Sequence, residues 1–233
     1  MIKKEELLYI RSRLDFWDKL IGAEMNILEN NIIKVSYKKG YNLRSTDSKC
    51  LGVFLIKRGG LRAYILSEAG REVTLYRLSP GNVCVLSASC ILNNITFNVH
   101  IDAEIDTDAY LINIGAFNKL SNQNVYVENF VYRNAIERFS DVMWAMEQIL
   151  FISIDKRLAI FLLDETAKSN STDLHIAQEQ IAKYIGSARE VVSRMLKVFQ
   201  SDGILEQSRG LIHIIDKEKL RELISIMMKR QRG

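Results

Sequence analysis

The first half of the chain alternates short apolar runs with turn residues. Glycine or proline recurs at Gly40, Gly59, Gly70 and Pro80, and turn signals at such spacing are typical of antiparallel strands. Pro80 and Gly81 suit the two central positions of a type II turn. The strands are expected at residues 32–37, 52–57, 61–66, 73–78, 95–101 and 109–114. Together these runs predict an antiparallel β-roll or barrel.

The residues before the first strand predict a short helical cap over this β-domain. Its packing residues are expected to be Leu7, Leu8, Leu14, Phe16, Trp17, Leu20 and Ile21.

One long helix is predicted from residues 125–150, which contain neither glycine nor proline. Apolar residues recur there at steps of three and four, which indicates a dimerisation seam. The seam comprises Val131, Ala135, Phe139, Val142, Met146 and Ile149. Phe130, Ile136, Met143 and Leu150 add apolar surface, so the helix is expected to contact both a partner helix and its own β-domain. An ordinary core helix within a monomer is the alternative. A joint at 151–155 and a second helix at 156–168 follow.

Residues 178–199 carry the pattern of two helices joined by a tight turn. Gly186 is expected to end the first helix, and Ser187 to cap the second. In the second helix one apolar stripe faces inward, and a polar stripe lies about 200° around the helix. The apolar stripe comprises Val191, Val192, Met195, Leu196 and Phe199. This pattern predicts a helix-turn-helix.

The polar stripe has side chains that suit base recognition. Arg189 and Arg194 can bind guanine bidentately, and Glu190 can accept a hydrogen bond from cytosine. With Ser193 they are the expected base contacts. Alternatively, Glu190 forms a capping box with Ser187, and the arginines are ordinary solvated residues.

A β-hairpin is predicted after this helix, at residues 204–215 with its turn at Ser208–Gly210, and Asp216 is expected to cap a last helix. A helix-turn-helix followed by a hairpin is a winged helix. The expected contacts to the DNA backbone, which position a protein without specifying sequence, are Ser187, Lys197, Arg209 and Gln178.

With these residues the chain resembles the Crp/Fnr superfamily of bacterial transcription regulators over nearly its whole length. The resemblance implies an α+β fold with a cyclic-nucleotide-binding-like antiparallel β-roll, a long dimerisation helix and a C-terminal winged helix-turn-helix. The corresponding domains are 1–115, 116–153 and 154–233. It also implies a homodimer on a pseudo-palindromic double-stranded DNA operator, half-sites such as TGTGA, and contact with RNA polymerase. Ser193 matches a residue that some oxygen-sensing members use.

The sensor half departs from the cyclic-nucleotide binders of this family. Leu86 stands where a ribose-binding glutamate belongs, and no arginine lies between Arg77 and Arg133 to bind a phosphate. Cyclic AMP is therefore not expected as the effector. A different small effector is expected in a pocket of Leu86, Ser87, Ser89, Cys90 and Thr96.

A redox signal is an alternative to a bound effector. Cys84 and Cys90 are either a redox pair or small buried hydrophobes. A regulator that binds DNA constitutively, with a ligand-free β-roll as its scaffold, also stays open.

The composition of the chain bears on its cellular location and on whether it is an enzyme or carries a cofactor. The chain has 233 residues, a net charge of +4, three cysteines and no apolar run long enough for a membrane span, which favours a cytoplasmic protein. Three cysteines, none before Cys50, do not support an iron–sulfur sensor. The three histidines are scattered, so an enzyme is not expected, and no cofactor or metal is predicted. Haem on His100 is a weaker alternative to a structural histidine.

Overall fold

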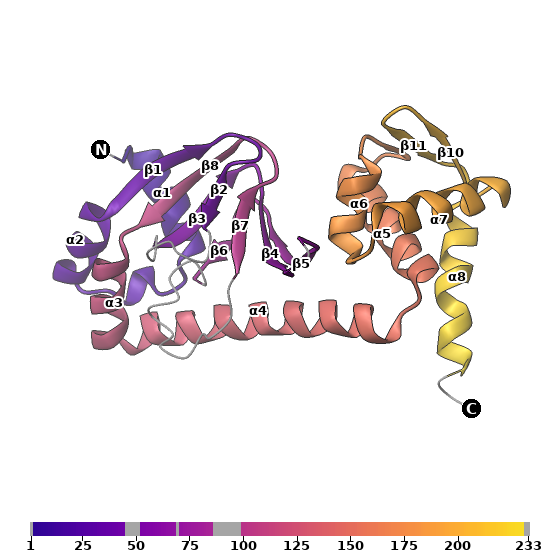
Figure 1. The fold of residues 1–233 in the computed structure, drawn as a ribbon. Helices are drawn as coiled ribbons and strands as arrows, with labels where there is room; N and C mark the ends of the chain where they lie inside the picture. Colours follow the sequence, from indigo (N-terminus) through magenta and orange to yellow (C-terminus); the bar gives the residue numbers. More distant parts are fainter. Residues whose placement is uncertain (1, 45–51, 69, 86–98, 231–233) are drawn as a thin grey trace. The chain divides into compact units, whose positions relative to one another are not determined.

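The computed structural model describes residues 2–44, 52–68, 70–85 and 99–230 (Figure 1). By its internal contacts the chain divides into two compact units. The first contains Met1–Ile65 and Leu75–Met143, and the second contains Leu66–Thr74 and Trp144–Gly233. The long helix α4 (Val125–Phe151) spans the boundary, and α5 (Ile154–Ser169) follows it after two residues.

Two four-stranded antiparallel sheets form the β-roll of the first unit. Their orders are β1-β8-β3-β6 and β2-β7-β4-β5. The strands are β1 (Ile32–Tyr37), β2 (Asn42–Arg44), β3 (Val53–Arg58), β4 (Leu61–Leu66), β5 (Glu72–Leu78), β6 (Val83–Cys84), β7 (His100–Ala103) and β8 (Thr107–Ile112). The expected β-roll is therefore present, and β1 and β4 have the predicted bounds.

One predicted strand boundary is wrong because an asparagine caps a helix. The strand expected at 109–114 ends at Ile112, because Asn113 Oδ1 accepts hydrogen bonds from the first N–H groups of α3 (Ile114–Gln123). The sequence pattern did not predict α3. It is separate from α4 because Asn124 has an extended backbone and its Oδ1 accepts from the N–H of Tyr126, at 3.0 Å.

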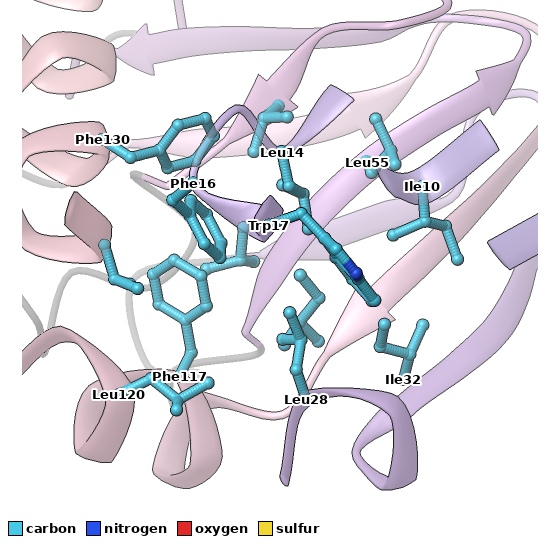
Figure 2. Packing of buried hydrophobic residues seen from close by; sticks show 14 of the residues in the cluster. Ile10, Leu14, Phe16, Trp17, Leu28, Ile32, Leu55, Phe117, Leu120 and Phe130 are labelled. Atoms are coloured by element: carbon cyan, nitrogen blue, oxygen red, sulfur yellow. The ribbon is translucent and has the colours of Figure 1, made fainter. Parts of the chain in front are cut away.

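Helices cover one side of the β-roll and share a core with it (Figure 2). These helices are α1 (Lys4–Arg13), η1 (Trp17–Lys19) and α2 (Gly22–Asn30), together with α3 and the first turns of α4. Phe16 lies at the centre, with its ring centroid 5.0 Å from that of Phe130 and 6.2 Å from that of Phe117, both in edge-on geometry. Phe130 thus fixes the start of α4 on the β-roll.

The predicted cap over the β-roll is confirmed for most of its packing residues. Leu14, Phe16, Trp17 and Leu20 are buried. Leu8 and Ile21 are exposed, so their assignment to the core was wrong. Both lie on a helix or at its start, where the apolar residue simply faces outward.

Glu6 connects α1 to the β-roll by hydrogen bonds and ion pairs. Its carboxylate lies 2.5 Å from Lys34 Nζ and 3.2 Å from Lys57 Nζ, and it accepts from the backbone N–H of Lys3. The hydrogen bond from Lys34, with those from Lys3 and Lys57, lowers the pKa of Glu6 from 4.5 to about 2.

Because the pKa of Glu6 is depressed in the folded chain, its contribution to stability is present above about pH 4.5 and is lost as the pH falls toward 2. We expect Glu6→Gln to flatten the fall in the free energy of unfolding between these pH values, measured by urea unfolding at several pH values. Glu5→Gln is the matched control, since no described residue pairs with Glu5. An equal flattening by both variants would contradict the assignment.

The second unit has its own core, built from helices and a three-stranded antiparallel sheet of order β10-β11-β9. After α5 its elements are β9 (Asp173–Leu174), α6 (Gln178–Ile185), α7 (Arg189–Ser201), β10 (Leu205–Ser208), β11 (Leu211–Ile214) and α8 (Lys217–Arg230). The α8 helix begins as expected, because Asp216 Oδ1 accepts from the N–H groups of Glu218 and Lys219.

Candidate nucleic-acid interface

The turn between α6 and α7 depends on Gly186. This residue has φ +61° and its N–H donates to the carbonyl of Ala182, as does that of Ser187 at 2.9 Å. The left-handed conformation is cheap for glycine, and the prediction that Gly186 ends α6 is confirmed. Arg157, which no sequence motif marks, also contributes: its Nη1 donates to the carbonyl of Ile185 at 2.7 Å. Arg157 therefore holds the end of α6 to α5.

The start of α7 differs from the prediction. The helix begins at Arg189 with Ala188 at the N-cap position, whereas Ser187 was expected there. The backbone of Ser187 completes the turn after α6, which places the serine one residue too early to cap α7. No capping box forms between Ser187 and Glu190. Ala188 has no side-chain oxygen, so the first N–H groups of α7 lack a side-chain cap.

The two faces of α7 are as different as its sequence predicts. Val192, Leu196 and Phe199 are buried in the core of the second unit. Arg189, Glu190, Arg194 and Lys197 are exposed, and Ser193 is half-buried. Among the described residues, none forms an ion pair or a side-chain hydrogen bond with these five side chains. The polar stripe is thus free to bind a ligand.

The hairpin of β10 and β11 turns at Arg209 and Gly210. Gly210 has φ +77°, and Arg209 is exposed at the tip. Gln178 is more constrained than expected: its Nε2 donates to Gln207 on β10, whose Nε2 donates to Gln200 on α7, both at 3.1 Å. This amide chain ties the start of α6 to the hairpin.

Comparison with known proteins agrees with this geometry. A family model described as a Crp-like helix-turn-helix domain matches residues 156–223. A crystal structure from Eubacterium rectale, assigned to the Crp/Fnr family of transcriptional regulators, is 42% identical with a TM-score of 0.88, over 92% of this chain and 99% of that one. This chain belongs to the Crp/Fnr family. It is a DNA-binding transcriptional regulator and not an enzyme.

Other Crp/Fnr relatives are more distant. The transcriptional activator protein anr of Pseudomonas aeruginosa is 26% identical over 78% of this chain and 77% of its own length. FixK2 from Bradyrhizobium japonicum shares the fold, with a TM-score of 0.65 at 21% identity over 82% of this chain and 96% of that one.

The expected effector residues Leu86, Ser87, Ser89, Cys90 and Thr96 lie outside the described residues. Cys84 is buried. His100 stacks on Tyr64, with ring centroids 5.2 Å apart, and within the described ranges no group of three potential metal ligands gathers. No described helix combines the length and apolar composition that a membrane span requires.

Helix α4 exposes an apolar seam that differs from the predicted one. Of the predicted residues, Val131 is buried in the core of its own unit, whereas Ala135, Val142 and Ile149 are half-buried. Only Phe139 and Met146 are exposed. The α4 seam in the structure has residues between 46% and 64% exposed at steps of four and three: Tyr132, Ile136, Phe139, Met143, Met146 and Leu150.

Proposed function

We propose that this Crp/Fnr regulator acts in the cytoplasm as a homodimer that binds a pseudo-palindromic operator through α7 and contacts RNA polymerase. An effector other than cyclic AMP, bound in the first unit, controls it. The three predicted domains, 1–115, 116–153 and 154–233, correspond in this proposal to sensing, dimerisation and DNA binding.

The free polar stripe of α7 is the observation that carries the proposal. A recognition helix reads bases with the N-terminal part of its exposed face, which here holds Arg189, Glu190, Ser193 and Arg194. No described residue forms an ion pair or a side-chain hydrogen bond with these side chains. Their polar groups therefore remain available to bind DNA bases. Each bidentate arginine–guanine contact contributes about 1–3 kcal/mol of discrimination.

Contacts to the DNA backbone are assigned to groups around this stripe. The uncapped N–H groups at the start of α7 favour an anion such as a phosphate. Lys197 on α7 and Arg209 at the hairpin tip offer exposed cations. Ser187 lies within the turn between α6 and α7, and Gln178 is the first residue of α6. These groups position the protein without specifying the sequence.

The α4 seam supports the homodimer. Its six residues follow the 4-3 spacing of a coiled-coil interface over about three heptads. Such a row of exposed large apolar side chains is unusual on a monomer and marks an interaction site. A second copy of α4 is its natural occupant, because the seam then pairs with itself about a twofold axis.

Base readout and backbone contact can be separated by two arginine variants. We expect Arg194→Ala to relax base preference at one position of each half-site, by about 1–3 kcal/mol. Arg209→Ala is expected to weaken binding to all sequences about equally and to reduce the salt slope of binding. Gel shifts against a set of single-base operator variants at two salt concentrations measure both effects. The reverse pattern would show that the two roles are exchanged.

Selection of bound sequences from random duplexes tests the proposal as a whole. The expected result is a pseudo-palindrome whose half-sites lie one helical turn apart, about 34–36 Å between centres. Enrichment of no sequence, or of a single asymmetric site, would sink the proposal. A steep salt dependence without enrichment would show phosphate binding alone.

A further inference from the structure

A cavity of about 210 Å³ lies in the first unit, where the end of α1, the turn between β5 and β6, and α4 come together. Its described lining residues differ from the residues that the sequence predicts for the effector pocket. It is smaller than the cavities of roughly 300 Å³ or more that hold drug-sized ligands. Its size therefore suits a small metabolite.

Arginine dominates the charge of this cavity. Arg13, Arg133 and Arg138 line it together with the carboxylates of Asp15 and Glu137, so the described lining has a net charge of +1 (three cations against two anions). Arg133 Nη2 lies 2.7 Å from Asp15 at the rim, where both side chains are mostly exposed. Apart from this pair, Arg13 and Arg138 are the other cations of the described lining.

Arg138 lies deepest of the three arginines. Its side chain is 13% exposed and pairs with Asp141 at 2.8 Å and with Glu137 at 3.5 Å. It lies over the ring of the buried Tyr76, 5.3 Å from its centroid. Its Nε is buried, and within the described part of the chain it has no hydrogen-bond partner. A buried donor without a partner costs free energy, so this N–H is poised for an acceptor.

Arg13 contributes a second cation, whose Cζ lies over the Tyr9 ring, 5.6 Å from its centroid. Among the described residues no carboxylate pairs with it, and its guanidinium lies against the backbone of Gly81. A Cβ at Gly81, which has φ +89°, would lie 3.2 Å from Arg13 Cζ. The absence of a side chain at Gly81 therefore leaves room for the Arg13 guanidinium beside the Pro80–Gly81 turn.

We propose that this cavity binds a small oxyanion, a carboxylate or a phosphate, between Arg13 and Arg138. Guanidinium N–H groups suit the oxygens of both classes of anion: Arg138 offers its Nε, and Arg13 offers a cation that no described carboxylate neutralises. Asn82 and Asn134 also line the cavity and add polar side chains to it. The inference deepens the proposed function, on which it rests, by naming the class of effector and its site.

The place of the cavity on α4 would couple the anion to dimerisation. At 100° per residue, Asn134 lies about 160° and Arg138 about 120° around α4 from the centre of the α4 seam, so both are off the seam. An anion that favours one position of α4 over another shifts the dimer toward that position, and DNA binding changes its affinity for the anion by the same factor.

Calorimetric titration of the full chain tests the site, with inorganic phosphate and succinate as separate probes at constant ionic strength. Saturable binding of at least one probe is expected, and the probe that binds more tightly distinguishes the phosphate from the carboxylate. Arg13→Gln is expected to weaken this binding tenfold or more, and Arg13→Lys to restore part of it. Arg11→Gln is the matched control, because Arg11 lies on the same helix but pairs with Asp18 outside the cavity.

Two outcomes would overturn the inference: no saturable binding of either probe, or equal loss in Arg13→Gln and Arg11→Gln. Gel shifts with and without the bound probe then measure the coupling, and unchanged operator affinity would overturn the role as effector. Sequence selection is independent of these titrations, so failure of the cavity and failure of DNA recognition are distinguishable.

Discussion

Phe139→Glu is expected to turn the dimer into monomers and to weaken operator binding at least 100-fold. Phe139 is 63% exposed in the single chain and central in the α4 seam. In a dimer each glutamate would lie unpaired in an apolar contact, which costs several kcal/mol for the two copies. A monomer keeps only one half-site, and 100-fold corresponds to about 2.7 kcal/mol. Analytical ultracentrifugation and gel shifts measure the two effects.

Two further variants distinguish the α4 seam from the seam predicted from the sequence and control for the added negative charge. Met143→Glu should act like Phe139→Glu, because Met143 lies in the α4 seam but not in the seam predicted from sequence. Gln123→Glu adds the same charge at the end of α3 and should leave the dimer intact. A dimeric Phe139→Glu with normal operator affinity would contradict the proposed interface.

Phe16→Ala is expected to destabilise the first unit by about 3–5 kcal/mol. Phe16 is 1% exposed, and its ring contacts Phe117 on α3 and Phe130 on α4 (Figure 2). Truncation leaves a cavity between three elements that cannot all move to fill it. Urea unfolding followed by far-UV circular dichroism measures the loss.

Leu8→Ala is the matched control for this core variant. Leu8 was expected in the same core but is 59% exposed, so its truncation should change the free energy of unfolding by no more than about 0.5 kcal/mol. Similar losses in both variants would show that the cap packs differently from the structure described above.

Local signals account for what could be predicted from the sequence. Gly186, the bounds of β1 and β4, and the Arg209–Gly210 turn are each specified by a few neighbouring residues, and the structure agrees with them. Helix starts were less predictable. Ser187 has the right chemistry for a cap, but its backbone completes the preceding turn.

Long-range packing accounts for most of what the sequence could not show. Two apolar stripes one residue apart run along α4, and only the position of the β-roll decides that Val131 and Val142 face inward while Ile136 and Met143 face out. Arg13 and Arg138 meet in one cavity although 125 residues separate them, which no local spacing reveals.

The chain contains two tryptophans, and the fold gives them opposite surroundings. Trp17 is buried in the first unit, whereas Trp144, at the start of the α4 segment in the second unit, is 53% exposed. An indole shielded from water fluoresces at shorter wavelength than a hydrated one. The shift of the tryptophan emission maximum on unfolding therefore arises mainly from Trp17. It reports the loss of the β-roll core without an attached dye.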